Sequence, residues 1–454
     1  MFRCYTFPVP TFSIENFGCR ATDADASAIR AKLLAGGLAL APDHSAADVV
    51  VLNTCTVTAA ADAQAREAVR KIHRANPGAR IVVTGCYAQR APEELAVLDG
   101  VAWVVGNSHQ SEIPGLVLEP ASAAHAARDF VPLSRLADET LSLAHGPAKI
   151  LTGDILAQTA LPVAPASNDH AETDRTRPIL KIQDGCNNRC SYCVIPFVRG
   201  RSRSLPPSAV VNEVQNLVAA GAKEIVLSGI NLGSYGRDLS PRAALEDLVR
   251  RILDETPIDR LRFSSIEPQD VTEDFVSLVA SLQRLAPHFH VPLQSGSDRI
   301  LRAMHRWYRT GHYAERIRLI RRMLPHAAIG ADVIVGFPGE TQDDFDATAR
   351  FIDELPFTYL HVFSFSERPG TAAEKFGERV SPHVIRERAR ALRALGERKA
   401  AAFRASQAGH TLRALTLNHS GDDWTEALTG NYLKVRIPGR HPANHWHDVP
   451  VAGN

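Results

Sequence analysis

The chain contains 454 residues, which is enough for about three domains of ordinary size. Apolar residues make up 45% of it, charged residues 22%, and the formal net charge is +1, so the composition is that of a globular protein and does not by itself indicate a polyanionic partner. No segment approaches the roughly 18 apolar residues of a membrane span, and no secretory signal is recognisable, so we expect a cytoplasmic protein without a membrane partner.

The first third of the chain repeats one arrangement: a strand-like run, a cysteine in a short turn, and an alanine-rich helical stretch. Cys19 follows FSIENFG, Cys55 follows DVVVLNT and Cys86 follows ARIVVTG. Alternating strands and helices predict a three-layer α/β domain with a parallel sheet over residues 1–118. Strand-to-helix loops all lie at the carboxyl edge of such a sheet, so the three cysteines can meet in space.

Residues 119–175 are rich in Ala, Pro, Ser and Asp and predict a linker. The segment 176–405 then carries six strand-like runs, most of them followed by a helical stretch: PILKIQ, EIVLSG, LRFSS, FHVPLQ, ADVIVGF and YLHVFSF. Six units are too few for an eight-unit barrel and predict an incomplete (β/α)6 barrel. Short alternating strands over 406–454 predict a small C-terminal β-barrel.

A second group of thiols follows the first barrel strand, where DGCNNRCSYC contains Cys186, Cys190 and Cys193. Closed iron–sulfur or structural zinc sites take four protein ligands, so three thiols in one loop indicate a metal site with one open position. Structural zinc with a distant fourth ligand, such as Cys4 or a histidine, is the alternative. Seven cysteines are too sparse and unevenly placed for a disulfide framework.

The spacing in CNNRCSYC resembles the signature of radical S-adenosylmethionine enzymes, and NFGC, NTCTVT and TGCYAQ resemble the N-terminal domain of the methylthiotransferases. The segments SSIEP, HVPLQSGS and DVIVGFPGET extend this resemblance over nearly the whole chain. It implies that the thiols of the barrel loop bind a 4Fe-4S cluster whose open iron holds S-adenosylmethionine. It also implies that the three N-terminal cysteines bind a second 4Fe-4S cluster, which delivers sulfur. Cys4 has no counterpart in the resemblance, and we interpret it as a spectator.

The resemblance implies that one S-adenosylmethionine is cleaved to a radical that activates a carbon–hydrogen bond, and that another supplies a methyl group. The segments leading into the loop and YLHVFSFSERPGTAA look most like the branch that 2-methylthiolates N6-threonylcarbamoyladenosine beside the tRNA anticodon. Branches acting on isopentenyladenosine or on a ribosomal aspartate remain open, as does a non-catalytic zinc- and RNA-binding protein. The implied partners are a tRNA anticodon loop and an electron donor such as flavodoxin or ferredoxin, but not DNA; the sulfur donor is unspecified.

Glycines and polar residues near the strand ends are expected to contact S-adenosylmethionine, and the backbone at the end of the fifth strand is expected to stack along its adenine. Each of these positions also has a structural interpretation as a tight turn or a helix cap, as for Thr341 with Asp344. The expected cofactor residues are Tyr192, Gly229, Asn231, Ser265, Glu267, Gln294, Ser295 and Val335.

Basic and aromatic residues provide the expected RNA contacts. Those predicted to bind phosphate or stack on bases are Arg199, Arg201, Arg203, Tyr432 and Lys434. The arginine-rich helical run after residue 382 fits either a solvated face or a phosphate contact.

Two further histidines, His288 and His290, alternate on one strand and share a face. Because no third ligand lies nearby in the sequence, we expect core or hydrogen-bonding histidines there rather than metal ligands.

Overall fold

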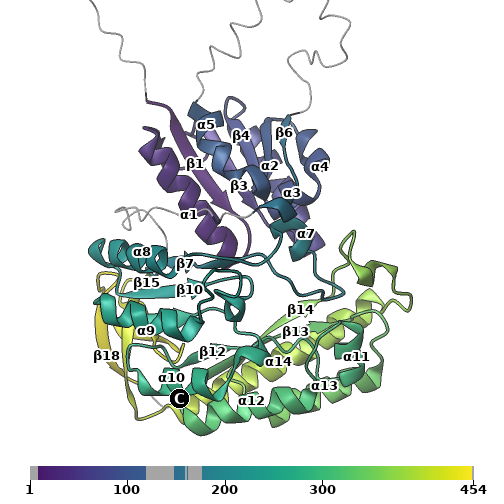
Figure 1. Cartoon of the computed structure of the whole chain (residues 1–454), viewed down its shortest axis with the longest axis vertical. Helices are drawn as coiled ribbons and strands as arrows, with labels where there is room; N and C mark the ends of the chain where they lie inside the picture. The colour runs from purple at the N-terminus through teal and green to yellow at the C-terminus, as the bar shows by residue number, and fades with distance from the viewer. Residues whose placement is uncertain (1–8, 119–147, 159–160, 162–175, 452–454) are drawn as a thin grey trace, which may run out of the picture. The chain divides into compact units, whose positions relative to one another are not determined.

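The computed structural model describes residues 9–118, 148–158, 161 and 176–451. The chain divides into two compact units (Figure 1). The first unit comprises residues 1–165 together with 194–201, and the second comprises 166–193 and 202–454. The short segment that follows Cys193 is therefore part of the first unit, although it lies between two segments of the second in the sequence.

The first unit is built on a six-stranded parallel sheet of order β2-β1-β3-β4-β5-β6. Its strands are β1 (Thr11–Asn16), β2 (Ala39–Leu40), β3 (Val49–Thr54), β4 (Arg80–Gly85), β5 (Val101–Gly106) and β6 (Lys149–Leu151). Its helices are α1 (Arg20–Ala35), α2 (Ala59–Ala75), α3 (Cys86–Arg90), α4 (Pro92–Ala96), α5 (Ile113–Leu118) and α7 (Ile195–Arg199).

A separate core covers each face of this sheet, which confirms the predicted three layers. Successive side chains of a strand point to opposite faces, and β3 is buried on both. Val50 and Leu52 pack in one core with residues of α2, and Val49 and Val51 pack in the other with residues of α1 and α5. The edge strand β6 falls within the segment that the sequence predicted to be a linker, so part of that segment belongs to the sheet.

The second unit contains an open barrel of parallel strands. Two three-stranded sheets, β11-β10-β7 and β12-β13-β14, are joined by single bridges between Leu261 and Leu285 and between Ser265 and His290. The six predicted strands are confirmed as β7 (Ile179–Lys181), β10 (Glu224–Ser228), β11 (Arg260–Phe263), β12 (His288–His290), β13 (Ala328–Val335) and β14 (Tyr359–Ser364), and a short pair, β8 (Gln183–Asp184) and β9 (Arg203–Ser204), follows β7.

Helices cover the outside of the barrel strands, and the longest, α14, lies along β14 (Figure 1). They are α8 (Pro207–Ala219), α9 (Leu245–Glu255), α10 (Glu273–Ser281), α11 (Asp298–Ala303), α12 (Thr310–Met323), α13 (Gln342–Glu354) and α14 (Pro382–Ser406). The predicted capping box is confirmed at α13, where Thr341 accepts from the backbone of Asp344 and the Asp344 side chain accepts from the backbone of Thr341.

The chain ends in an antiparallel half-barrel sheet of order β17-β16-β15-β18. Its strands are β15 (Thr411–Ser420), β16 (Trp424–Thr429), β17 (Lys434–Pro438) and β18 (Trp446–Pro450). Buried Arg262 joins this sheet to the barrel, because its guanidinium donates to the carbonyl oxygens of Thr429 and Gly430 while also pairing with Glu224.

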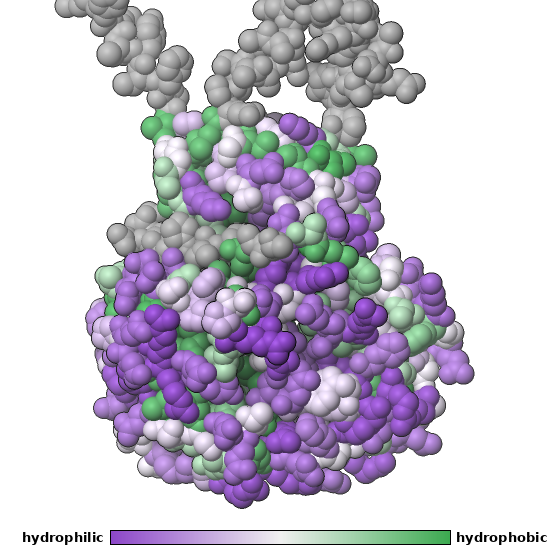
Figure 2. Space-filling model, in the orientation of Figure 1, coloured by the Kyte–Doolittle hydropathy of each residue, from purple (hydrophilic) through white to green (hydrophobic). Residues whose placement is uncertain are grey.

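Within the described residues, no helix is long and apolar enough to cross a membrane. Hydrophilic side chains dominate the visible face of the second unit in Figure 2.

Candidate functional site

Three thiols of the first unit lie at the carboxyl ends of neighbouring parallel strands. Cys19 follows β1 and is the N-cap of α1, Cys55 follows β3, and Cys86 follows β4 as the first residue of α3. Gly85, with φ of +96°, makes the sharp turn before Cys86, and a Cβ there would lie 2.3 Å from the carbonyl oxygen of Thr54. The parallel sheet therefore brings together residues that are far apart in the sequence.

Cys86 and Cys19 lie close enough to Cys55 to affect its ionisation. Burial and, to a smaller extent, the nearby thiols of Cys86 and Cys19 together raise the pKa of Cys55 to about 12, because burial and adjacent thiolates both disfavour the charged form. Burial also raises the pKa of Cys86. Binding of a cation would therefore have to displace protons from this group, as thiolate coordination does.

Polar partners surround the N-terminal thiols. The backbone N–H of Val57 donates to Sγ of Cys55 over 3.4 Å, and the amide of Asn107 donates to Sγ of Cys86 over 3.5 Å. Hydrogen bonds of this kind stabilise and orient metal-bound thiolates.

A buried arginine also lies beside these thiols. Arg199 forms an ion pair with Asp25 at 2.8 Å, and its charge opposes the rise in the pKa of Cys86 that burial causes. Because Arg199 is only 2% exposed, it is not accessible to an RNA phosphate, and the structure assigns it to the thiol group instead.

The three thiols of the second unit follow β7 and β8 in one loop. Cys186, Cys190 and Cys193 are each half-buried. Burial raises the pKa of Cys186, and the thiol of Cys190 adds to the rise. The backbone N–H of Asn188 donates to Sγ of Cys186 over 3.4 Å. The loop therefore holds its thiols close together and supplies a hydrogen bond to one of them.

Gln183, which the sequence analysis did not single out, fixes this loop. Its side-chain amide donates to the carbonyl oxygens of Asp184 and Gly185, and its side-chain oxygen accepts from the backbone N–H of Asn231 over 2.8 Å. A Cβ at Gly229 would lie 2.8 Å from the Gln183 side chain, so glycine is needed there for packing. This one buried glutamine connects the thiol loop to the loop after β10.

Arg306 is a second residue that sequence reasoning missed. Its guanidinium donates to Sγ of Cys190 over 3.3 Å and forms an ion pair with Glu267. Burial raises the pKa of Glu267, and Arg306 opposes that rise. Each group of three thiols thus has a buried arginine–carboxylate pair beside it.

Three of the expected cofactor residues lie at the thiol loop, and two others lie near the neighbouring strands β12 and β13. Tyr192, Asn231 and Glu267 lie at the loop: Tyr192 and Glu267 are close enough to Arg306 to affect its ionisation, and the side chain of Asn231 opposes the rise in the pKa of Cys186 that burial causes. Ser265 is at the bridge to β12, and Gln294 adopts φ of +68° beside β13.

The remaining expected residues support the scaffold through their side chains. Ser295 is buried with its hydroxyl 3.3 Å from that of Thr348 in α13. Val335 is fully buried, and by strand alternation it points away from the face that carries Ile334.

The expected RNA residues lie in different environments. Arg201 and Lys434 are exposed, whereas Arg203 is only 8% exposed. Tyr432 is half-buried and stacks on His288 with ring centroids 4.3 Å apart, so its ring is occupied inside the second unit.

The donor set fits iron–sulfur ligation at both places. The six cysteines discussed above are not joined in disulfides. Each set of three receives hydrogen bonds at sulfur and would leave one coordination position of a four-metal cluster to another ligand. Cys4, the predicted spectator, lies outside the described residues.

Comparison with known proteins supports this interpretation. Residues 180–352 match the Radical SAM superfamily, and residues 11–106 match the uncharacterized protein family UPF0004. The chain is 35% identical over 431 residues to the threonylcarbamoyladenosine tRNA methylthiotransferase MtaB of Aquifex aeolicus, covering 94% of this chain and 96% of that protein. It is 36% identical over 384 residues to the tRNA-2-methylthio-N(6)-dimethylallyladenosine synthase of Syntrophobacter fumaroxidans, covering 84% of this chain and 79% of that protein.

A solved structure shares the fold at low sequence identity. The radical S-adenosylmethionine methyltransferase TsrM of Kitasatospora setae, solved with cobalamin and a 4Fe-4S cluster, superposes with a TM-score of 0.56 at 17% identity, covering 80% of this chain and 77% of that one. The superfamily implies one 4Fe-4S cluster and S-adenosylmethionine. The chain belongs to the tRNA methylthiotransferases of the radical S-adenosylmethionine superfamily.

Proposed function

We propose that this protein 2-methylthiolates N6-threonylcarbamoyladenosine beside the anticodon of a cytoplasmic tRNA, with two 4Fe-4S clusters and two molecules of S-adenosylmethionine. The observation that carries the proposal is the presence of two separate groups of three cysteine thiols, each at the carboxyl edge of its own parallel sheet. Three thiol ligands leave an exchangeable position on each cluster, so one cluster can bind S-adenosylmethionine and the other can hold sulfur.

When bound, the cluster and S-adenosylmethionine supply the one-electron chemistry that activates a carbon–hydrogen bond. The protein's part is to hold, orient and shield the reacting groups. The ion pair of Arg306 and Glu267 lies beside Cys190, and the buried amide of Asn231 lies beside Cys186. Among the described residues, the side-chain oxygen of Asn231 and the hydroxyl of Ser264 are buried without a hydrogen-bond partner, so both are placed to bind a polar ligand at these strand ends.

Exposed cations are proposed to hold the tRNA backbone. Arg386, Arg390 and Arg393 form one stripe along α14 and line a groove of about 410 Å³, whose other polar lining residues are Ser364 and Glu397. In the part of the chain that the structure describes, none of the three is ion-paired with a carboxylate. Unpaired arginines in a groove are suited to phosphate. We keep Arg201 and Lys434 as further candidate RNA contacts, and flavodoxin or ferredoxin as the proposed electron donor.

The choice of nucleoside rests on the relatives. The proteins named for threonylcarbamoyladenosine match this chain over nearly their full length, which favours that substrate. The relative named for dimethylallyladenosine, at 36% identity, makes isopentenyl-type adenosine the second candidate.

The test is a direct assay of both nucleosides. Anaerobically reconstituted protein is incubated with S-adenosylmethionine, a reductant and tRNA carrying either modification, and the digested nucleosides are analysed by mass spectrometry. We expect the threonylcarbamoyl nucleoside to gain one methylthio group. Methylthiolation of the isopentenyl nucleoside alone would assign the protein to the other branch, and no product with either tRNA, despite S-adenosylmethionine cleavage, would reject tRNA as the substrate.

A further inference from the structure

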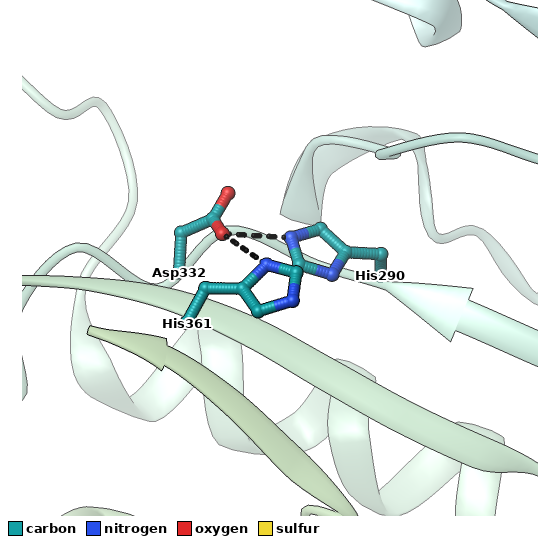
Figure 3. A group of neighbouring side chains, drawn as sticks. All are labelled: His290, Asp332 and His361. Atoms are coloured by element: carbon teal, nitrogen blue, oxygen red, sulfur yellow. Dashed lines mark hydrogen bonds and ion pairs between the residues drawn. The ribbon is translucent and has the colours of Figure 1, made fainter. Parts of the chain in front are cut away.

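Two histidines and an aspartate of the second unit meet on three adjacent parallel strands (Figure 3). His290 ends β12, Asp332 lies in β13, and His361 lies opposite Asp332 in β14. One carboxylate oxygen of Asp332 lies 3.0 Å from Nε2 of His290 and 3.3 Å from Nδ1 of His361. No further ligand lies near His290 in the sequence, but the sheet brings Asp332 and His361 next to it.

This cluster faces the inside of the barrel. Leu360 of β14 packs against Gly396 of α14, which covers the outside, so the neighbouring His361 points to the opposite, inner face. On the same face of β13, Ile334 follows Asp332 by two residues, a rise of about 7 Å along the strand.

Ile334 connects the cluster to the thiol loop. It packs against the apolar group of Ile300, Met304 and Phe337, which also includes Tyr192 from between Cys190 and Cys193. The two histidines and Asp332 therefore line the same barrel interior as the proposed cofactor. They lie two residues before Ile334 along β13, farther from the thiol loop.

The exposed fraction of the side chain increases from His290 through Asp332 to His361. The side chain of His290 is 5% exposed, that of Asp332 22% and that of His361 51%. Phe363, two residues along β14, is 44% exposed and contacts the His361 ring edge to face. An exposed imidazole and an exposed phenyl ring on the inner face of a barrel are a surface suited to a planar base with a polar substituent.

Hydrogen bonds hold the imidazole of His361 in one orientation. The carboxylate of Asp332 contacts Nδ1 of His361 and Nε2 of His290. The hydroxyl of Tyr359 in turn lies 3.0 Å from Nδ1 of His290. Burial alone would raise the pKa of Asp332, but the hydrogen bonds from the two histidines outweigh it and hold that pKa well below the usual range. The carboxylate is therefore charged, and Nε2 of His361 points away from it.

We propose that His361 recognises the carboxylate of the substrate's threonylcarbamoyl group, with Asp332 as the residue that positions it; this inference rests on the proposed function. Nε2 of His361 donates to the substrate carboxylate, while the contact between Nδ1 and Asp332 fixes the orientation of the ring. An isopentenyl group at the same place would cover His361 without offering a hydrogen bond. Sites built to bind a polar group reject analogues that lack it, because their own buried groups are then left unpaired.

The same three side chains form a donor set that divalent metal ions use. In this structure the distances of 3.0 and 3.3 Å are those of direct hydrogen bonds, so each side chain already satisfies the others. A resident metal ion is therefore an outcome that the experiment must separate from carboxylate recognition.

The experiment uses the reconstituted enzyme and synthetic anticodon stem-loops that carry either the threonylcarbamoyl group or its carboxamide analogue. Wild type is expected to have a lower KM for the carboxylate. His361→Phe should raise that KM by about tenfold to a hundredfold, as for loss of a charged hydrogen bond, while leaving the KM for the carboxamide nearly unchanged. Asp332→Asn should produce a smaller rise, again restricted to the carboxylate stem-loop and to KM rather than kcat. The matched control is His383→Phe, which breaks an exposed histidine–carboxylate pair with Glu387 on α14 and should have no effect.

Different outcomes separate the two levels of the proposal. If wild type methylthiolates the threonylcarbamoyl stem-loop and His361→Phe retains its preference for the carboxylate, this inference is wrong while the proposed function stands. If wild type modifies only an isopentenyl stem-loop, the proposed function fails first. Metal analysis that finds a stoichiometric zinc or manganese ion in wild type, lost in Asp332→Ala without loss of iron, would also overturn carboxylate recognition in favour of a metal centre.

Discussion

Arg306 donates a hydrogen bond to the sulfur of Cys190 over 3.3 Å while its other side is ion-paired with Glu267. In the first unit, Arg199 is ion-paired with Asp25, and its charge opposes the rise in the pKa of Cys86 that burial causes. Iron–sulfur clusters with three thiolate ligands carry negative charge. A neighbouring guanidinium stabilises the reduced form of such a cluster more than the oxidised form, because the reduced form is more negative.

Replacing Arg306 should therefore make the barrel cluster harder to reduce. We expect Arg306→Gln to shift its reduction potential to a more negative value, and Arg306→Lys, which keeps the charge, to shift it less. The measurement is an electron paramagnetic resonance redox titration of anaerobically reconstituted protein. Iron content serves as the control for cluster assembly, and an unchanged potential at full iron content would show that Arg306 does not act on the cluster.

Removing one thiol from each group should remove one cluster at a time. We expect about eight irons in wild type, a loss of about four in Cys186→Ala and a separate loss of about four in Cys55→Ala, measured by iron and sulfide analysis. Cys4→Ala is the matched control and should lose none. Zinc in place of iron, or loss from only one of the two variants, contradicts the two-cluster proposal.

The arginine stripe of α14 should govern the salt dependence of tRNA binding. Each phosphate contact that is lost reduces the slope of log affinity against log salt by about one, so Arg386→Ala, Arg390→Ala and Arg393→Ala together should reduce it by about three. The measurement is fluorescence anisotropy of labelled tRNA over a range of salt concentrations. Arg251→Ala, which removes an exposed arginine paired with Glu255 on α9, should leave the slope unchanged. An unaltered slope in the triple variant would show that the stripe is a solvated face.

Glu224 should make the second unit sensitive to acid. Burial raises the pKa of this fully buried carboxylate, but Arg262, Arg260 and Arg177 outweigh burial and lower it to about 2 from 4.5. Since the folded-state value is the lower one, the stabilisation is complete above about pH 4.5 and is lost as pH falls toward 2.

The variant Glu224→Gln should lower the free energy of unfolding at pH 7 by about 3–5 kcal/mol, because it leaves buried arginines without their counter-ion. Its difference from wild type should shrink below pH 4.5, as followed by urea unfolding at each pH. Glu255→Gln, at an exposed surface pair, should change the stability by less than about 1 kcal/mol. A difference that stays constant with pH would show that Glu224 is not the titrating group.

The local pattern of the sequence was sufficient for the strands and the thiols. β-branched runs followed by cysteines predicted β1, β3 and β4 and placed Cys19, Cys55 and Cys86 at one edge, because parallel strands with helical connections all end on the same side. The capping box at Thr341 was predictable for the same reason, since it depends only on residues three apart.

Contacts between residues that are distant along the chain could not be predicted from the sequence. No spacing rule connects Arg306 to Cys190, or His290 to Asp332 and His361, because barrel closure sets which side chains share an interior. The same limit explains Arg199, whose place beside the thiol loop suggested phosphate binding and which the structure buries against Asp25.

The sequence by itself determined the class of chemistry, because metal ligation needs particular side chains and the chain presents six cysteines in two sets. Only the tertiary structure decided what surrounds each set and what lines the barrel. Those properties depend on burial and on which strands become neighbours, and both arise when the apolar faces pack together rather than along the chain.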